Sequence, residues 1–237
     1  MSTPRWPRFT PVADHALLVT FAEVIGDDTS AALMALDRAL ARAPCTGFLE
    51  CVPAMVSLLV AFDPLLTDHG QVQAHVEAHI RARLEAGSIE PAPGRVHEVE
   101  VCYDADFAPD LAAVAAASGR SAEEVIALHQ QAPYRVRMYG FAPGFAYLSG
   151  VPAAIQVPRK PAATRGIPAG SVLVAGPQCL VTTLVMPTGW SVIGRSPTRI
   201  LDPDSPTPFL FEVGDMVRFV RIDRARYDQP SRDGSDG

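Results

Sequence analysis

The chain of 237 residues lacks several features that would define its class. No charged stretch followed by a long apolar run opens it, so we expect no signal peptide. No apolar run approaches the roughly 20 residues that cross a bilayer. The four cysteines form no C-x-x-C pair and show no zinc-finger spacing. We therefore expect a cytoplasmic protein with reduced thiols and no membrane partner.

Positive charge is also scarce. The formal net charge is -6, and Lys160 is the only lysine. A surface that binds nucleic acid needs a basic patch to neutralise phosphates, so we expect no nucleic-acid partner. The hydrophobic content of 48% still describes a globular protein with a substantial core.

Standard nucleotide and nucleophile motifs are missing. The chain contains no Gly-x-x-x-x-Gly-Lys phosphate loop, no Gly-x-Gly-x-x-Gly and no Gly-x-Ser-x-Gly. His75 and His79 have the i, i+4 spacing that can chelate a metal, but no His-Glu-x-x-His accompanies them. A solvated helix face is the simpler interpretation, so we expect no metal site.

The N-terminal part alternates strand-like runs with amphipathic helices. A helical stripe of Val72, Val76, Ile80 and Leu84 is the clearest pattern. Strands are expected at 9–21, 47–52 and 57–62, the last two separated by Pro53, and helices at 30–41 and 70–86. This order predicts an α+β domain over residues 1–93, which ends at a cluster of two prolines and a glycine in residues 91–94.

The C-terminal part is mostly β. Two short helices are expected at 110–116 and 121–131, the second opened by the capping box of Ser121 and Glu124. Strands are expected at 96–101, 134–139, 171–175, 180–185, 191–193, 209–212 and 216–221, with Gly and Pro at the junctions. This pattern of short strands predicts a closed barrel or sandwich over residues 94–225, followed by a disordered tail at 226–237.

The run Gly-Phe-Ala-Pro-Gly-Phe-Ala-Tyr-Leu at 140–148 suits neither a helix nor a regular central strand. It predicts a stiff, aromatic loop close to other backbone. Such a loop either forms one wall of a binding site or closes a barrel end as a structural corner.

Many separate motifs resemble those of the KipI/PxpB family, also called allophanate hydrolase subunit 1 or the carboxyltransferase C/D subdomain family. They include residues 134–148, Pro-Ala-Gly-Ser-Val at 168–172, Ala-Gly with Gln178 at 175–178, Gly-Trp at 189–190, Ile-Gly-Arg at 193–195 and Gly-Asp at 214–215. Ser-Leu-Leu-Val at 57–60 leading to Asp-Pro at 63–64 also matches. The resemblance covers about residues 9–222.

The resemblance implies an α+β N-terminal domain followed by a cyclophilin-like β-barrel domain. It also implies a subunit of an ATP-dependent 5-oxoprolinase, a hydrolase that opens the lactam ring of pyroglutamate to give glutamate. The implied partners are a PxpC-type protein (allophanate hydrolase subunit 2) and a PxpA-type protein. ATP with Mg²⁺ is the implied cofactor, shared with those partners, and the substrate is a small carboxylate or lactam. Alternatives within the family are a KipI-like inhibitor of a sensor histidine kinase and a carboxyltransferase subdomain of a urea amidolyase or other biotin-dependent system.

Given the resemblance, we expect the candidate catalytic residues to be His129, Arg159 and Arg165. Guanidinium groups suit a carboxylate or phosphate because they bind oxyanions in a bidentate fork, although a solvated basic loop explains Arg159, Lys160 and Arg165 equally well. An imidazole at His129 can act as general acid or base, or it can cap the C-terminal carbonyls of its helix.

The expected substrate-binding residues are Phe145, Tyr147, Gln178 and Arg195, with Phe145 and Tyr147 facing the two arginines and Gln178 across a groove. Cation–π packing of Arg195 on Trp190 is an alternative role for that arginine.

The chain departs from the family pattern beside this groove. Cys-Leu-Val-Thr-Thr at 179–183 replaces the usual Thr-Gly-Ile-Tyr-Pro, and Met-Pro-Thr-Gly-Trp at 186–190 replaces Ser-Pro-Gly-Gly-Trp. The expected Pro-Arg pair is also absent, since Thr164 holds the place of the arginine. A paralogue with another amide or carboxyl substrate is therefore an open alternative.

Overall fold

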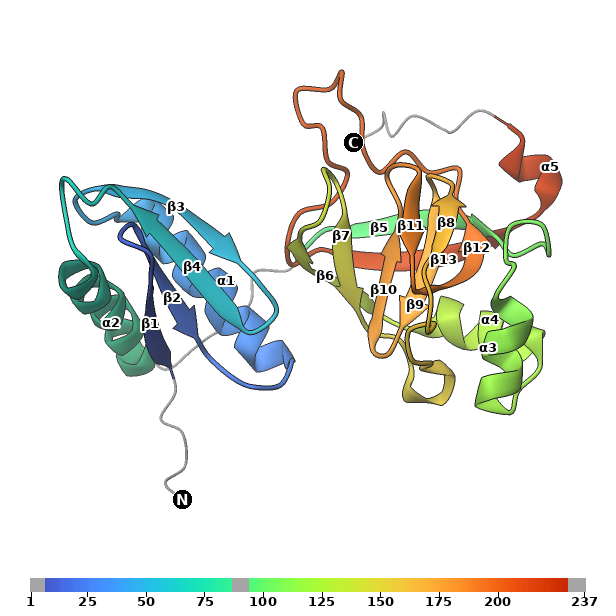
Figure 1. Ribbon diagram of the computed structural model, residues 1–237, viewed down its shortest axis with the longest axis horizontal. Coiled ribbons are helices and arrows are strands. Elements are labelled where there is room, and N and C mark those ends of the chain that lie inside the picture. The colour runs from blue at the N-terminus through green and yellow to red at the C-terminus, as the bar shows by residue number, and fades with distance from the viewer. Residues whose placement is uncertain (1–6, 87–93, 230–237) are drawn as a thin grey trace. The chain divides into compact units, whose positions relative to one another are not determined.

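The computed structural model describes residues 7–86 and 94–229 (Figure 1). The chain divides into two compact units, residues 1–93 and 94–237. The predicted boundary residues 91–93 and most of the predicted tail lie outside the described residues.

The first unit is a four-stranded antiparallel sheet with two helices. Its strand order is β1-β2-β4-β3, and its strands are β1 (Arg8–Val12), β2 (Ala16–Thr20), β3 (Phe48–Pro53) and β4 (Ser57–Phe62). The helices are α1 (Asp27–Arg42) and α2 (His69–Ala86). Pro53 ends β3 rather than lying between strands, which an edge strand tolerates because no neighbour needs its missing N–H.

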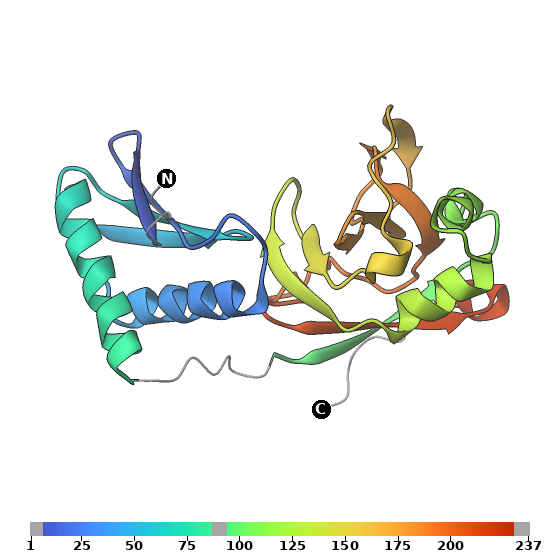
Figure 2. The same cartoon turned by 90° about the horizontal axis from the view of Figure 1, so that it is seen from below.

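Period-two alternation explains the core of this unit. Leu17, Val19, Leu58 and Val60 project from one face of the sheet and are fully buried. Val72 and Val76 of α2 join the same cluster, as the helical stripe predicts. Figure 2 shows α1 running along one face of the strands of this unit.

The second unit is built on a closed barrel of seven strands, in the order β10-β7-β6-β13-β5-β12-β9. The barrel strands are β5 (Val96–Cys102), β6 (Tyr134–Tyr139), β7 (Ala146–Ser149), β9 (Ser171–Ala175), β10 (Gln178–Val181), β12 (Ser191–Arg195) and β13 (Met216–Ile222). The short strands β8 (Thr164–Ile167) and β11 (Met186–Thr188) pair separately. A barrel is therefore present, and its cyclophilin-like classification stays a prediction.

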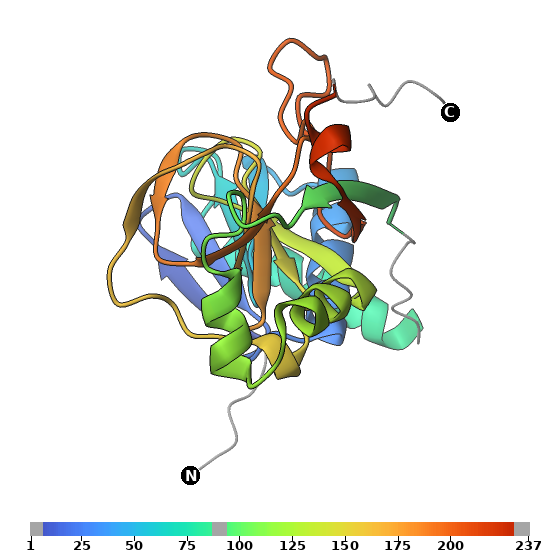
Figure 3. The ribbon, with the colours of Figure 1, turned by 90° about the vertical axis from the view of Figure 1, so that its right-hand side faces the viewer.

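The helices of this unit are α3 (Leu111–Ser118), α4 (Ala122–Gln131) and α5 (Arg224–Tyr227), with a 3₁₀ turn, η1 (Ala153–Ile155). α3 and α4 lie side by side (yellow-green in Figure 3). The capping box of α4 forms as predicted: the Glu124 amide donates to Ser121 Oγ, and the Ser121 amide donates back to the Glu124 carboxylate.

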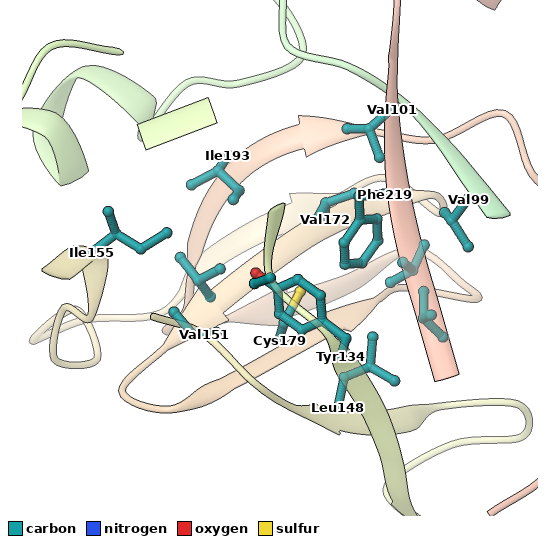
Figure 4. Close-up of a cluster of buried hydrophobic side chains, with 14 of the residues drawn as sticks. Val99, Val101, Tyr134, Leu148, Val151, Ile155, Val172, Cys179, Ile193 and Phe219 are labelled. Carbon is teal, nitrogen blue, oxygen red and sulfur yellow. The ribbon is translucent and has the colours of Figure 1, made fainter. Parts of the chain in front are cut away.

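Large apolar side chains from all round the barrel meet in its interior (Figure 4). Tyr134, Leu148, Phe219 and Ile193 are fully or almost fully buried there, together with the thiol of Cys179. This interior is a packed core, so a ligand has to be held outside it.

Four expectations about elements are wrong. Residues 9–21 do not form one strand, because β1 and β2 are a hairpin. Residues 209–212 form no strand, only an isolated bridge between Phe209 and Leu201, and the strand expected at 180–185 ends at Val181. Residues 226–229 are not a disordered tail, because Arg226 and Tyr227 belong to α5. The Arg226 guanidinium lies 2.9 Å from Glu100, which fixes this end of the chain to β5.

Candidate functional site

A pocket of about 150 Å³ lies on the outside of the barrel. It is bounded by the loop that joins β6 to β7, by β10, by the segment after η1 and by the chain from β11 to β12. The described residues that line it are Phe141, Phe145, Tyr147, Arg159, Leu180, Met186, Pro187, Thr188, Gly189 and Trp190. The pocket therefore brings together three of the predicted site residues: Phe145, Tyr147 and Arg159.

The loop at 140–145 is held tightly against its surroundings. The Phe145 amide donates to the Ala142 carbonyl at 3.1 Å, and Thr183 Oγ1 donates to the Pro143 carbonyl at 2.8 Å. Gly144 has φ +69, and a Cβ there would lie 3.2 Å from the side chains of Thr183 and Leu201. Only glycine meets both demands easily. Residues 140–145 therefore form a loop, as predicted, and the last part of the run, from Ala146, becomes strand β7.

Phe141 is unusual for its backbone and for its exposure. Its φ is +74, a region that a bulky residue rarely adopts, and the residue is 70% exposed. Its ring centroid lies 5.2 Å from that of Phe145, which is buried. Strained residues gather at binding sites, because a surrounding structure has to hold them in place. The strain at Phe141 therefore points to this pocket rather than to a merely structural corner.

Arg159 and Trp190 form the charged end of the pocket. The Arg159 guanidinium carbon lies 5.5 Å from the centroid of the Trp190 ring, within cation–π range. The Trp190 amide donates to Thr188 Oγ1 at 3.0 Å, which fixes the turn that presents the ring. Cation–π packing of Arg195 on Trp190, the alternative role expected for that arginine, is wrong. Arg195 ends β12, roughly 16 Å along the strand, and its guanidinium lies over the Phe107 ring at 5.6 Å.

The composition of the pocket limits what it can do. Aromatic rings of Phe145, Tyr147 and Trp190 supply flat apolar walls, and Arg159 supplies the only formal charge among the described lining residues. Such a pocket can stack a small planar group and bind an attached anion. The described lining residues include no carboxylate, imidazole or thiol, so they provide no ordinary general base.

His129 lies in the barrel core, away from this pocket. It is fully buried and stacks on Phe219 at 4.5 Å between ring centroids. Its Nδ1 lies 2.8 Å from the Tyr103 hydroxyl and its Nε2 lies 3.7 Å from the Cys179 sulfur. Burial lowers the pKa of His129 from 6.5 to about 3, so the ring is neutral near pH 7. This position removes His129 from the candidate catalytic residues, and it does not cap its helix either.

Arg165 and Gln178 are also absent from the described lining of the pocket. Arg165 is exposed on β8, and Gln178 begins β10 opposite Ala175. Of the three residues expected opposite the aromatic loop, only Arg159 is among the described residues that line the pocket. Trp190 and Thr188 complete the pocket wall, although neither was expected to contact a ligand.

The unusual segment at 179–183 contributes little to the pocket. Alternation along β10 turns Cys179 and Val181 into the barrel core and leaves Leu180 on the side of Phe145 and Trp190. The Thr182 hydroxyl is buried and donates to the Pro168 carbonyl at 2.7 Å. This departure from the family pattern therefore changes mainly the core, whereas the departure at 186–190 lies in the pocket wall.

Histidines of α2 were the only metal candidates in the sequence. His79 Nε2 lies 3.2 Å from His75 Nε2, which in turn lies 2.9 Å from the Ala43 carbonyl oxygen. Within residues 7–86 and 94–229, no group of three or more His, Cys, Asp or Glu side chains is arranged to hold a metal ion. Over the same residues, no helix has the length and apolar character to cross a membrane.

The second unit therefore combines a closed barrel with an external pocket lined by aromatic rings and one guanidinium. Comparison with known families makes this more specific: the chain belongs to the carboxyltransferase domain, subdomain C and D family, whose model matches residues 7–211. The resemblance to this family is therefore confirmed.

Individual relatives of the chain are named as 5-oxoprolinase subunits. The chain is 35% identical over 226 residues to the B subunit of 5-oxoprolinase from Bacillus subtilis (strain 168), covering 91% of this chain and 93% of that protein. It is 41% identical over 136 residues to the B subunit of 5-oxoprolinase from Escherichia coli O157:H7, covering 57% of this chain and 62% of that protein.

Solved structures show the same fold as part of longer chains. The crystal structure of TTHA0988 matches with a TM-score of 0.76 and 36% identity, over 89% of this chain and 40% of that one. The Kluyveromyces lactis urea amidolyase matches with a TM-score of 0.75 and 14% identity, over 93% of this chain and 15% of that one, which shows the fold alone.

Proposed function

We propose that this chain is a subunit of a 5-oxoprolinase-type complex, in which its pocket holds the small carboxylated lactam. The main support is the Arg159 guanidinium fixed over Trp190 at the end of an aromatic pocket. A guanidinium pairs with a carboxylate through two parallel hydrogen bonds, and the flat ring of a lactam can lie against Trp190 or Tyr147. The relatives named as B subunits of 5-oxoprolinase support the same reaction class.

The proposal assigns binding to this chain and bond breaking to the complex. Ring opening needs an activated lactam oxygen and a base for the attacking water. The described pocket residues offer a guanidinium and aromatic walls but no such base. The word subunit in the names of the relatives supports a multi-subunit enzyme. We propose a PxpC-type and a PxpA-type protein as the partners that supply the rest.

We propose that ATP with Mg²⁺ binds to the partner subunits and not to this pocket. A pocket of about 150 Å³ is small for a nucleotide, since sites for drug-sized ligands span roughly 300–1,000 Å³. One guanidinium also does not replace a phosphate loop. The residues present therefore fit a small carboxylate better than a triphosphate.

A cytoplasmic location is part of the same proposal. All four cysteines are free thiols, and free thiols are typical of a reducing compartment. The alternatives of a kinase inhibitor and a biotin-dependent carboxyltransferase have no specific support in the pocket. The likeness to urea amidolyase, at 14% identity, extends to the fold alone.

The test reconstitutes the chain with its PxpC-type and PxpA-type partners and measures ATP hydrolysis that depends on 5-oxoproline. Arg159→Ala should lower kcat/KM by about 10- to 100-fold, because a hydrogen bond to a charged group contributes about 1.5–3 kcal/mol. Arg218→Ala is the matched control, since it removes an arginine from β13 outside the pocket. Arg165→Ala distinguishes the pocket from the wider groove expected from the sequence.

Two outcomes contradict the proposal. One is a complex with no ATP hydrolysis dependent on 5-oxoproline in any combination of partners. The other is a complex in which Arg159→Ala behaves like Arg218→Ala, since the pocket would then play no part in the reaction.

A further inference from the structure

Asp110, the N-cap residue of α3, connects two segments of the pocket wall. Its Oδ2 accepts a hydrogen bond from Lys160 Nζ at 2.7 Å and another from the Val192 amide at 2.8 Å. Its own amide donates to the Val192 carbonyl at 3.0 Å. The side chains of Lys160 and Asp110 are only 23% and 22% exposed. This ion pair is therefore more enclosed than an ordinary surface pair, and the Asp110 carboxylate is tied to the barrel as well as to Lys160.

Lys160 is also fixed through its backbone. Its amide donates to the Gly189 carbonyl at 2.6 Å, next to Trp190. The segment 159–160 is thus joined to 189–192 twice, once by the backbone and once through Asp110. Arg159 leaves this segment immediately before Lys160, and its guanidinium lies over Trp190. A long exposed arginine side chain has many rotamers, so its place depends strongly on where its backbone is held.

A direct role for Lys160 in ligand binding is the competing explanation. Its ammonium group is directed to the Asp110 carboxylate, and it is not among the described residues that line the pocket. A ligand anion would also meet the charge of Asp110 at that point. The arrangement therefore favours an indirect effect, through the residue next to Lys160.

We propose that Asp110 and Lys160 are positioning residues that hold Arg159 over Trp190 and so set the affinity of the pocket for an anion. This inference rests on the proposed function of the pocket as an anion site. It assigns no contact with the ligand to either residue. Its specific consequence is that both residues act only through Arg159.

The first experiment needs no activity. Trp6→Phe leaves Trp190 as the only tryptophan, and its quenching by acrylamide reports how well the ring is covered. Arg159→Ala should raise the quenching constant, and Lys160→Met and Asp110→Asn should each raise it at least half as far. Lys160→Arg, which keeps the charge, should raise the quenching constant less than Lys160→Met does. Arg218→Ala should leave it unchanged.

The second experiment measures KM and kcat for 5-oxoproline in the reconstituted complex. Lys160→Met and Asp110→Asn should raise KM about tenfold with little change in kcat, which is the result of weaker uniform binding. In an Arg159→Ala background the same changes should have no further effect, because their route to the ligand is gone. Thermal unfolding of each variant shows that the protein is folded.

Undiminished effects in the Arg159→Ala background would overturn the proposal, and so would unchanged quenching in both Lys160→Met and Asp110→Asn. If the complex has no activity towards 5-oxoproline at all, the proposed function fails, whereas the quenching data still decide the positioning role. Asp110→Asn keeps a side-chain oxygen that can accept the hydrogen bond from the Val192 amide. This variant therefore removes the charge of Asp110 and retains the hydrogen bond between α3 and β12.

Discussion

Lowering the pH from 7 to 5 should destabilise the second unit through His129. The imidazole is fully buried, and burial lowers its pKa from 6.5 to about 3. Between these values the unfolded chain takes up a proton that the folded protein does not, so stability is complete above pH 6.5 and is lost as the pH falls towards 3. At pH 5 the loss from this one group is about 2 kcal/mol. That is a large part of the 5–15 kcal/mol that typically stabilises a domain.

The measurement is urea unfolding at pH 7, 6 and 5, followed by the fluorescence of Trp190 in a Trp6→Phe background, so that the signal comes from the second unit. His129→Asn is the perturbation, because its amide can still face the Tyr103 hydroxyl. The variant should be less stable at pH 7, since it loses the packing on Phe219. When the pH is lowered from 7 to 5, its free energy of unfolding should nevertheless decrease less than that of the parent protein.

The difference between the two proteins isolates the histidine, since the carboxylates titrate in both. That difference should shrink by about 2 kcal/mol between pH 7 and pH 5. His15→Asn, which removes an exposed imidazole from the first unit, is the control for loss of a histidine elsewhere. A difference that stays constant across this pH range would refute the assignment of His129 as a buried neutral ring.

Three further outcomes are expected. Ser121→Ala should lower stability by about 1 kcal/mol in thermal unfolding, because it removes the N-cap of α4; an unchanged midpoint would contradict the capping role. Cys179 should stay unmodified by iodoacetamide at pH 8 until the protein unfolds, because burial raises the pKa of its thiol; labelling of the native protein would contradict this. Phe141→Gly should be about 1 kcal/mol more stable than Phe141→Ala, since only glycine relieves the positive φ, and both should bind 5-oxoproline more weakly; equal stability would show that the residue is unstrained.

The helices and the longer strands could be predicted from the sequence because their signals are local. Val72, Val76 and Ile80 of the α2 stripe pack against the core as expected, and the capping box of α4 forms. Strands β7, β8 and β11 were missed, since each has only three or four residues and depends on distant partners. A short strand of this kind forms because a partner strand lies beside it in the fold, and the local sequence does not show that partner.

In the candidate site, too, some features could be predicted from the sequence and others depend on the fold. The aromatic loop and Arg159 could be found from residue type and resemblance, and the structure brings them into one pocket. Trp190 was paired with the wrong arginine. Arg195 is near in sequence but lies at the far end of β12, whereas the fold places the Arg159 guanidinium over the Trp190 ring. His129 looked catalytic by its chemistry alone. Only the barrel around it shows that the ring is enclosed.

The parallel pairing of β5 with β13 determines when the barrel can close during synthesis. Val96 of β5 pairs with Met216 of β13, and the Asp215 carboxylate accepts a hydrogen bond from the Arg95 amide across 120 positions of sequence. On the ribosome, β5 is made early and has to wait until β13 has left the exit tunnel before the barrel can close. Until then, unpaired strand edges and the apolar interior are exposed to chaperones and to other nascent chains. Synonymous or nonsense changes late in the gene should therefore affect the solubility of the whole barrel rather than of its last strand alone.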